Sequence, residues 1–74
     1  MERNRKIGIE VQAGKKAEIL VGKLYDILTD GSITAKVRDD YICEVSIDAP
    51  KEEAAKCLNI CNDTGVPMRL TYVK

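Results

Sequence analysis

The chain has 74 residues, of which 45% are hydrophobic, and its twelve basic side chains balance twelve acidic ones. This length predicts a single domain over residues 1–74, and the hydrophobic fraction excludes intrinsic disorder. A formal net charge of zero argues against binding that is driven by bulk electrostatics, as in most nucleic-acid binders.

The first half of the chain alternates between strand and helix patterns. Apolar residues take every second position over Lys6–Gln12, which predicts a half-buried strand. Apolar residues at helical spacing then predict a helix over Ala17–Thr29, with Gly31 as its stop. The period of two returns over Ile33–Val37 and Tyr41–Ile47, which predicts two further strands.

The loop between these two strands decides which residues face each other. A two-residue loop would place Arg38 and Tyr41 side by side on one face, which mixes a charge with an inward ring. We therefore predict a three-residue loop that pairs Val37 with Tyr41 and Ala35 with Cys43.

The second half of the chain predicts one more helix and one more strand. The helix begins after Pro50 and ends at Gly65, because proline suits a helix start and glycine a helix end. Alternation over Val66–Val73 predicts the last strand, with Tyr72 turned inward and Val73 turned outward.

This order of elements predicts the fold class. Strand, helix, strand, strand, helix, strand with right-handed crossovers gives an α+β, ferredoxin-like βαββαβ fold. We expect a four-stranded antiparallel sheet with two helices on one face, and with the first and third strands in its centre.

Residues that could carry catalysis or hold a metal are few. Histidine is absent, the acidic residues are scattered, and we expect no catalytic residue, no cofactor and no enzymatic activity. Cys43, Cys57 and Cys61 all fall on inward-facing positions, and three thiolates without histidine fall short of a structural zinc site. We therefore predict buried, reduced thiols and no metal.

The compartment follows from three further observations. No apolar run approaches the ~20 residues of a membrane span, and residues 1–6 lack the apolar stretch of a signal peptide, so we expect none. Reduced thiols are typical of the cytoplasm. We expect a cytoplasmic protein without a membrane partner.

Exposed apolar residues indicate where a partner could bind. Ile19 lies opposite the inward stripe of the first helix, and Ile42 and Val73 are expected on the open face of the sheet. A small core combined with these residues predicts a homodimer and a protein partner, which would bind at the sheet face, an edge strand or a helix. An RNA-binding module has the same element order but uses aromatic side chains on its central strands, so nucleic acid is not expected.

The turn after the first strand is a candidate site for a small anionic ligand. Gly14 would let the backbone approach a ligand closely at a helix start, and Lys15 and Lys16 add positive charge. The alternative is that Gly14 only makes the turn and the lysines are solvated.

The chain as a whole resembles an ACT domain. The resemblance rests on Gly14 after the first strand, the helix Ala17–Thr29, the hairpin, the second helix and the closing strand. The family's Asp-x-Pro-Gly-like turn corresponds to Val11-Gln12-Ala13-Gly14, which keeps the glycine and lacks the proline and the acid. The resemblance implies a regulatory module that pairs its sheets into a dimer and binds a small ligand near Gly14.

Three functions therefore stay open at this point. The first is a non-enzymatic protein-interaction module of the adaptor or inhibitor type, which requires no missing motif. The second is an ACT-like regulatory domain that binds a small anion, and the third is an RNA-binding module.

Overall fold

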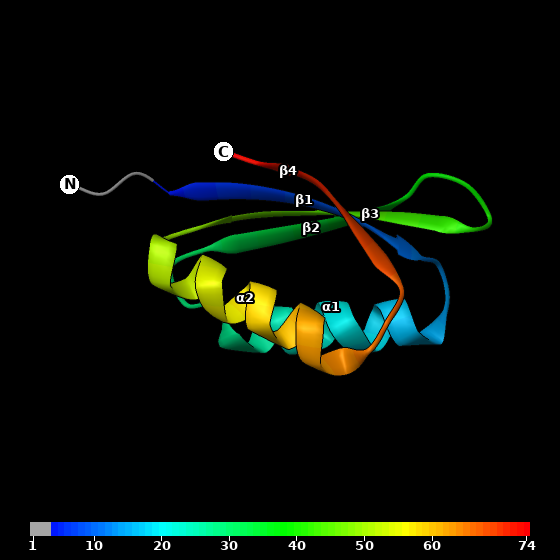
Figure 1. Ribbon diagram of the computed structural model, residues 1–74, viewed down its shortest axis with the longest axis horizontal. Coiled ribbons are helices and arrows are strands. Elements are labelled where there is room, and N and C mark those ends of the chain that lie inside the picture. The colour runs from blue at the N-terminus through cyan, green and yellow to red at the C-terminus, as the bar shows by residue number, and fades with distance from the viewer. Residues whose placement is uncertain (1–3) are drawn as a thin grey trace.

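The computed structural model describes residues 4–74, and these form one sheet and two helices. The strands are β1 (Arg5–Gln12), β2 (Ser32–Val37), β3 (Ile42–Ala49) and β4 (Met68–Val73), all antiparallel to their neighbours in the order β2-β3-β1-β4. Helices α1 (Lys15–Ile27) and α2 (Lys51–Thr64) lie on one face of the sheet, and the other face is open (Figure 1). The predicted ferredoxin-like fold is confirmed, with β1 and β3 in the centre. The prediction of one domain includes residues 1–3, which lie outside the described part of the chain.

The hydrophobic core lies between the sheet and the helix layer. Alternate side chains of β1 and β3 point into it and meet the apolar stripes of both helices. The buried apolar residues are Ile7, Ile9, Val11, Ala17, Leu20, Leu24, Cys43, Val45, Ile47, Ala49, Ala54, Cys57 and Cys61. The inward-facing stripes predicted for the central strands and the two helices are therefore largely confirmed.

The ends of the helices follow from local backbone geometry. α1 ends at Ile27, since Leu28 is extended and its N–H donates to the Tyr25 carbonyl at 3.3 Å. The predicted helix stop at Gly31 is wrong: that glycine is needed because a Cβ there would lie 2.5 Å from the Ala49 Cβ. Gly65 ends α2 in the left-handed conformation, as predicted. Neither helix is long and apolar enough to cross a membrane.

The loop between β2 and β3 lies one residue further along the chain than predicted. Val37 faces Cys43, so the predicted pairing of Val37 with Tyr41 is wrong. The Arg38 N–H donates to the Ile42 carbonyl at 2.9 Å, which leaves residues 39–41 between this pair. The Asp39 carboxylate accepts hydrogen bonds from the backbone N–H groups of Tyr41 (2.8 Å) and Ile42 (3.0 Å) and so stabilises this turn. Tyr41 is therefore 74% exposed instead of buried.

Strand β4 contains an irregularity that the alternation pattern did not reveal. Leu70 faces Ile9, but the next residue of β1, Gly8, faces Tyr72. Thr71 is thus an extra residue on the β4 side, which is a β-bulge. Gly8 gives it room, because a Cβ at Gly8 would overlap with the ring of Tyr72 and lie 2.5 Å from the Thr71 hydroxyl.

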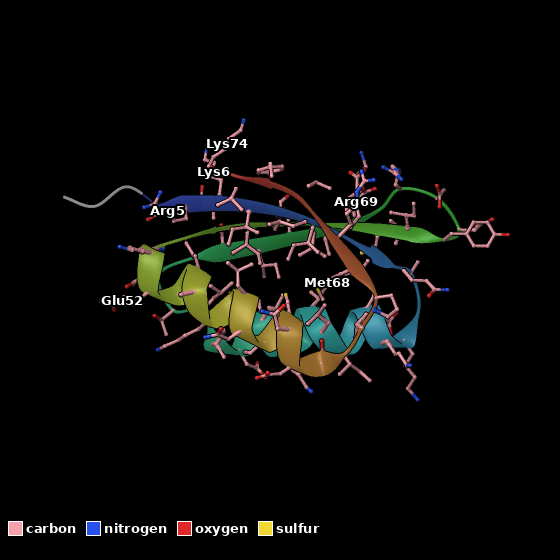
Figure 2. All side chains as sticks on the ribbon, in the orientation of Figure 1. Arg5, Lys6, Glu52, Met68, Arg69 and Lys74 are labelled. Atoms are coloured by element: carbon pink, nitrogen blue, oxygen red, sulfur yellow. The ribbon has the colours of Figure 1, made fainter. Side chains whose placement is uncertain are left out.

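The bulge reverses the sides of the last β4 residues. Before it the alternation is regular, since Met68 points toward the helices and Arg69 away from them (Figure 2). After it Tyr72 lies on the open face, while Val73 pairs with Ile7 and so belongs to the helix side. The predicted inward position of Tyr72 and outward position of Val73 are therefore both wrong.

Candidate functional site

The outer edge of β2 presents free backbone groups. The Arg38 N–H donates to the Ile42 carbonyl at 2.9 Å, which marks a hydrogen-bonded pair at the end of this ladder. Hydrogen-bonded and non-hydrogen-bonded pairs alternate along an antiparallel ladder. The N–H and C=O groups of Ile33, Ala35 and Val37 consequently point away from β3 toward the free edge. Such a row can pair with an added strand.

An apolar hollow of about 310 Å³ lies beside this edge, between β2 and the start of α1. Ala35 and Val37 line it from the sheet and Val21 from the helix, and Glu18 is its one acidic wall residue. Val37 is 65% exposed although it faces the helix layer, because an edge strand has a neighbour on one side only. The hollow could accept an apolar side chain from a strand laid against β2.

Tyr25 lies on the same side of α1 as the residues that line this hollow. It follows Glu18 and Val21 at a spacing that places the three residues along one side of α1. Its side chain is 69% exposed, so its ring is free to contact another molecule. We call the free β2 edge, the hollow and Tyr25 the β2 edge site.

Glu53 anchors the chain where it enters β2. One carboxylate oxygen accepts hydrogen bonds from the N–H groups of Thr29 (2.9 Å) and Gly31 (3.2 Å), and the other accepts from the Thr29 hydroxyl (3.1 Å) and the Asp30 N–H (3.2 Å). Burial of this side chain opposes ionisation, but the hydrogen bonds outweigh it and hold the pKa of Glu53 below its usual value. Sequence patterns missed this role because the partners lie more than 20 residues away along the chain.

The predicted ligand residues Gly14, Lys15 and Lys16 lie together at a second hollow. It has a volume of about 320 Å³ and is also lined by Val66 and Pro67 from the loop before β4. Gly14 has a φ of 141°, which favours glycine, and both lysines are exposed. The two hollows share Ala13 and Gly14 as lining, so they flank the same turn; ligand binding here stays a prediction.

The predicted interface residues Ile19, Ile42 and Val73 do not come together. Ile19 is half exposed on the outer side of α1, and Ile42 is partly buried at the end of the open face. Val73 lies on the helix side of β4. They belong to three separate surfaces, and their role in an interface stays a prediction. The sequence contains little indication of the residues that form the β2 edge site, since the alternation pattern placed Val37 among the inward-facing strand residues.

Charged residues on the open face pair with one another. Glu10 contacts Arg38 at 2.9 Å and Arg69 at 3.1 Å, and Arg38 also contacts Glu44 at 3.1 Å. Neither β1 nor β3 carries an aromatic residue, so the central strands lack the stacking surface that single-stranded RNA requires. The open face therefore gives no support to the RNA-binding alternative.

The three cysteines lie in the core, as predicted. Burial, the neighbouring Cys61 and the negative charge of Glu53 raise the pKa of Cys57 to about 11, and burial raises the pKa of Cys61. Both thiols are protonated at neutral pH and are poor nucleophiles. Residues 4–74 contain no group of three or more histidine, cysteine or acidic side chains that could hold a metal.

Comparisons with known proteins add a likeness at the level of the fold. No family model and no curated protein matches the sequence. A provisionally assigned PII-like signaling protein from Thermus thermophilus superposes with a TM-score of 0.69 at 13% identity, over 96% of this chain and 84% of that one. A DUF3240 family protein from Shewanella baltica gives a TM-score of 0.62 at 17% identity, over 99% and 89% of the two chains. The specific resemblance to ACT domains remains a prediction.

Proposed function

We propose that this chain is a small, non-enzymatic regulatory module that binds a protein partner by strand addition at the β2 edge site. The observation that carries the proposal is the free edge of β2 lying beside an apolar hollow. Strand addition takes its affinity from backbone hydrogen bonds and its specificity from pockets for alternate side chains. The β2 edge site offers both elements next to each other.

The chemistry of the buried side chains supports a role in binding. The pKa values of Cys57 and Cys61 lie above neutral pH, which disfavours thiolate chemistry. The buried carboxylate of Glu53 accepts hydrogen bonds from the turn before β2. A fold shared with a PII-like signaling protein is compatible with a regulatory role.

A proline substitution can test the edge without disturbing the fold. The Ala35 N–H points outward, so Ala35→Pro removes an edge donor while sparing the ladder to β3. We expect peptides selected on the immobilised protein from a displayed random library to lose binding to Ala35→Pro. Val73→Pro is the matched control, because it removes an outward N–H from the other edge, and it should bind as the unaltered chain does.

The readout must separate binding from folding. Circular dichroism and amide spectra of Ala35→Pro should keep the pattern of the folded chain. Selected peptides that bind Ala35→Pro as tightly as the unaltered protein would contradict the proposal.

A second candidate function is recognition of a small anion at Gly14, Lys15 and Lys16. The specific observation in its favour is the second hollow, in which two lysines lie beside a helix start. Titration with phosphate, nucleotides and amino acids should shift the amide signals of Gly14 to Ala17. Substitution of both lysines by alanine should remove those shifts, and a lack of any shift in the unaltered chain would exclude this candidate.

A further inference from the structure

Acidic side chains surround the β2 edge site at both of its ends. Asp30 comes two residues before β2, and Asp39 and Asp40 follow it in the loop to β3. Glu18 lines the hollow from the helix side. All four residues are exposed, so their charges are accessible to a molecule that binds at this edge.

The basic residues of β2 and of the loop after it lie on the other face of the sheet. Arg38 is engaged on the open face, where it contacts Glu10 at 2.9 Å and Glu44 at 3.1 Å. Lys36 lies opposite Glu44 in the ladder, on the same open face. Lys15 and Lys16 line the second hollow, whereas the charged residue that lines the hollow beside β2 is Glu18.

The position of one acid is fixed by the backbone. The Asp39 carboxylate accepts hydrogen bonds from the N–H groups of Tyr41 and Ile42, at 2.8 and 3.0 Å. This holds a negative charge at the Val37 end of the strand. An acid at each end means that a basic residue on an added strand meets a complementary charge whichever way that strand runs.

These charges also disfavour a second copy of the chain as the occupant. Two β2 strands that use all three outward residues would pair about a twofold axis at Ala35. That register places Asp30 of one copy opposite Asp40 of the other, and like charges facing each other across a ladder are destabilising. A partner with basic flanks avoids this repulsion.

We propose that the segment received at the β2 edge site is an extended strand with an apolar side chain for the hollow and basic residues on both flanks. This inference rests on the proposed function above. It specifies the partner as a basic, β-prone segment of another protein.

Synthetic peptides test the charge preference directly. The probe is acetyl-Lys-Thr-Val-Thr-Val-Thr-Lys-amide, compared with a version that has glutamate at both lysines and a version that has serine at both valines. Exposed ion pairs contribute little each, so we expect the basic peptide to bind roughly three- to tenfold more tightly than the acidic one at low salt. The preference should shrink as salt is added, and the serine version should bind more weakly than the basic peptide.

Variants of the protein locate the effect. Glu18→Gln combined with Asp40→Asn should reduce the preference for the basic peptide, while the Asp39 carboxylate keeps the loop intact. Two results would overturn the inference: the acidic peptide binds the unaltered chain as tightly as the basic one or more tightly, or the double variant keeps the full preference for the basic peptide. Neither result would contradict strand addition at the β2 edge site. Binding of each peptide is measured by the shifts of the amide signals of Ile33 to Val37. If no peptide binds, the result counts against the proposed function itself.

Self-association is the remaining outcome. If the amide signals of β2 broaden with protein concentration in the absence of peptide, and Ala35→Pro removes the broadening, the occupant is a second copy. That result would overturn the inference about the partner while keeping the edge as the binding surface.

Discussion

The two edges of the sheet differ in how they are protected. β4 begins after Pro67, carries the bulge at Thr71 and includes Arg69, and each of these features discourages pairing with another strand. β2 is regular over its six residues, has neither proline nor bulge, and carries a single lysine, Lys36. Natural sheets usually protect their edges, and the weaker protection of the β2 edge beside an apolar hollow is the reason that we propose it as the binding surface.

The comparison also shows that exposed apolar area alone does not identify a site. Leu70 and Val73 on β4 are each about half exposed, much like Val37 on β2. What distinguishes β2 is the straight row of free backbone groups beside a hollow.

The largest expected effect comes from removing the room that the bulge requires. Gly8→Val would place methyl groups where the ring of Tyr72 and the hydroxyl of Thr71 now lie, so β4 would be displaced from β1. Overpacking of this kind costs about 1 to 3 kcal/mol of unfolding free energy. Urea unfolding measures the loss, and it should shrink in a Tyr72→Ala background; an equal loss in both backgrounds would show that the ring is not the obstacle.

A second substitution tests the anchor of β2. Glu53 has a lowered pKa in the fold, so it stabilises the fold at neutral pH, and this contribution is lost as the pH falls from the ordinary glutamate value of about 4.3 through the lowered one. Glu53→Gln should therefore unfold at lower urea concentration than the unaltered chain at pH 7, and the difference should narrow toward pH 3. Glu52→Gln is the matched control, because Glu52 is exposed and lies at the same end of α2 (Figure 2).

The behaviour of this control decides the interpretation. Glu52→Gln should change stability little at either pH. If Glu53→Gln shows the same difference at pH 7 and pH 3, the ionised carboxylate is not what holds the turn before β2.

Deleting the bulge should make the two edges alike. Without Thr71 the alternation of β4 becomes regular, while Tyr72 and Val73 keep their present partners Gly8 and Ile7. We expect stability to change by no more than roughly 1 kcal/mol, since the apolar pattern is preserved. Sedimentation should reveal more self-association than in the unaltered chain, and an unchanged profile would mean that the bulge does not guard this edge.

The smallest effect is a difference in thiol labelling. Cys43 is 7% exposed and lines the hollow beside β2, whereas Cys57 is fully buried. Mass mapping after brief alkylation at pH 8 should find Cys43 modified first. A peptide bound at the β2 edge site should slow that reaction, and faster labelling of Cys57 would contradict the assignment of the hollow.

The sequence by itself determined the order of elements and the inward faces of the central strands and helices. Periods of two and 3.6 residues record which side of each element is buried, and glycine and proline mark several ends, so the ferredoxin-like fold and the core positions of Cys57 and Cys61 followed directly. These signals are local, and they do not depend on distant partners.

Only the tertiary structure decided the register of the edges and the site. The turn stabilised by Asp39, the bulge opposite Gly8 and the hydrogen bonds of Glu53 to the turn at Gly31 each depend on backbone groups of a particular geometry. A pattern of apolar residues does not encode that geometry. Whether an inward-facing residue such as Val37 is covered depends on where its strand lies in the sheet. Burial is a property of the whole packed layer, so the exposed edge became visible only once the layers were assembled.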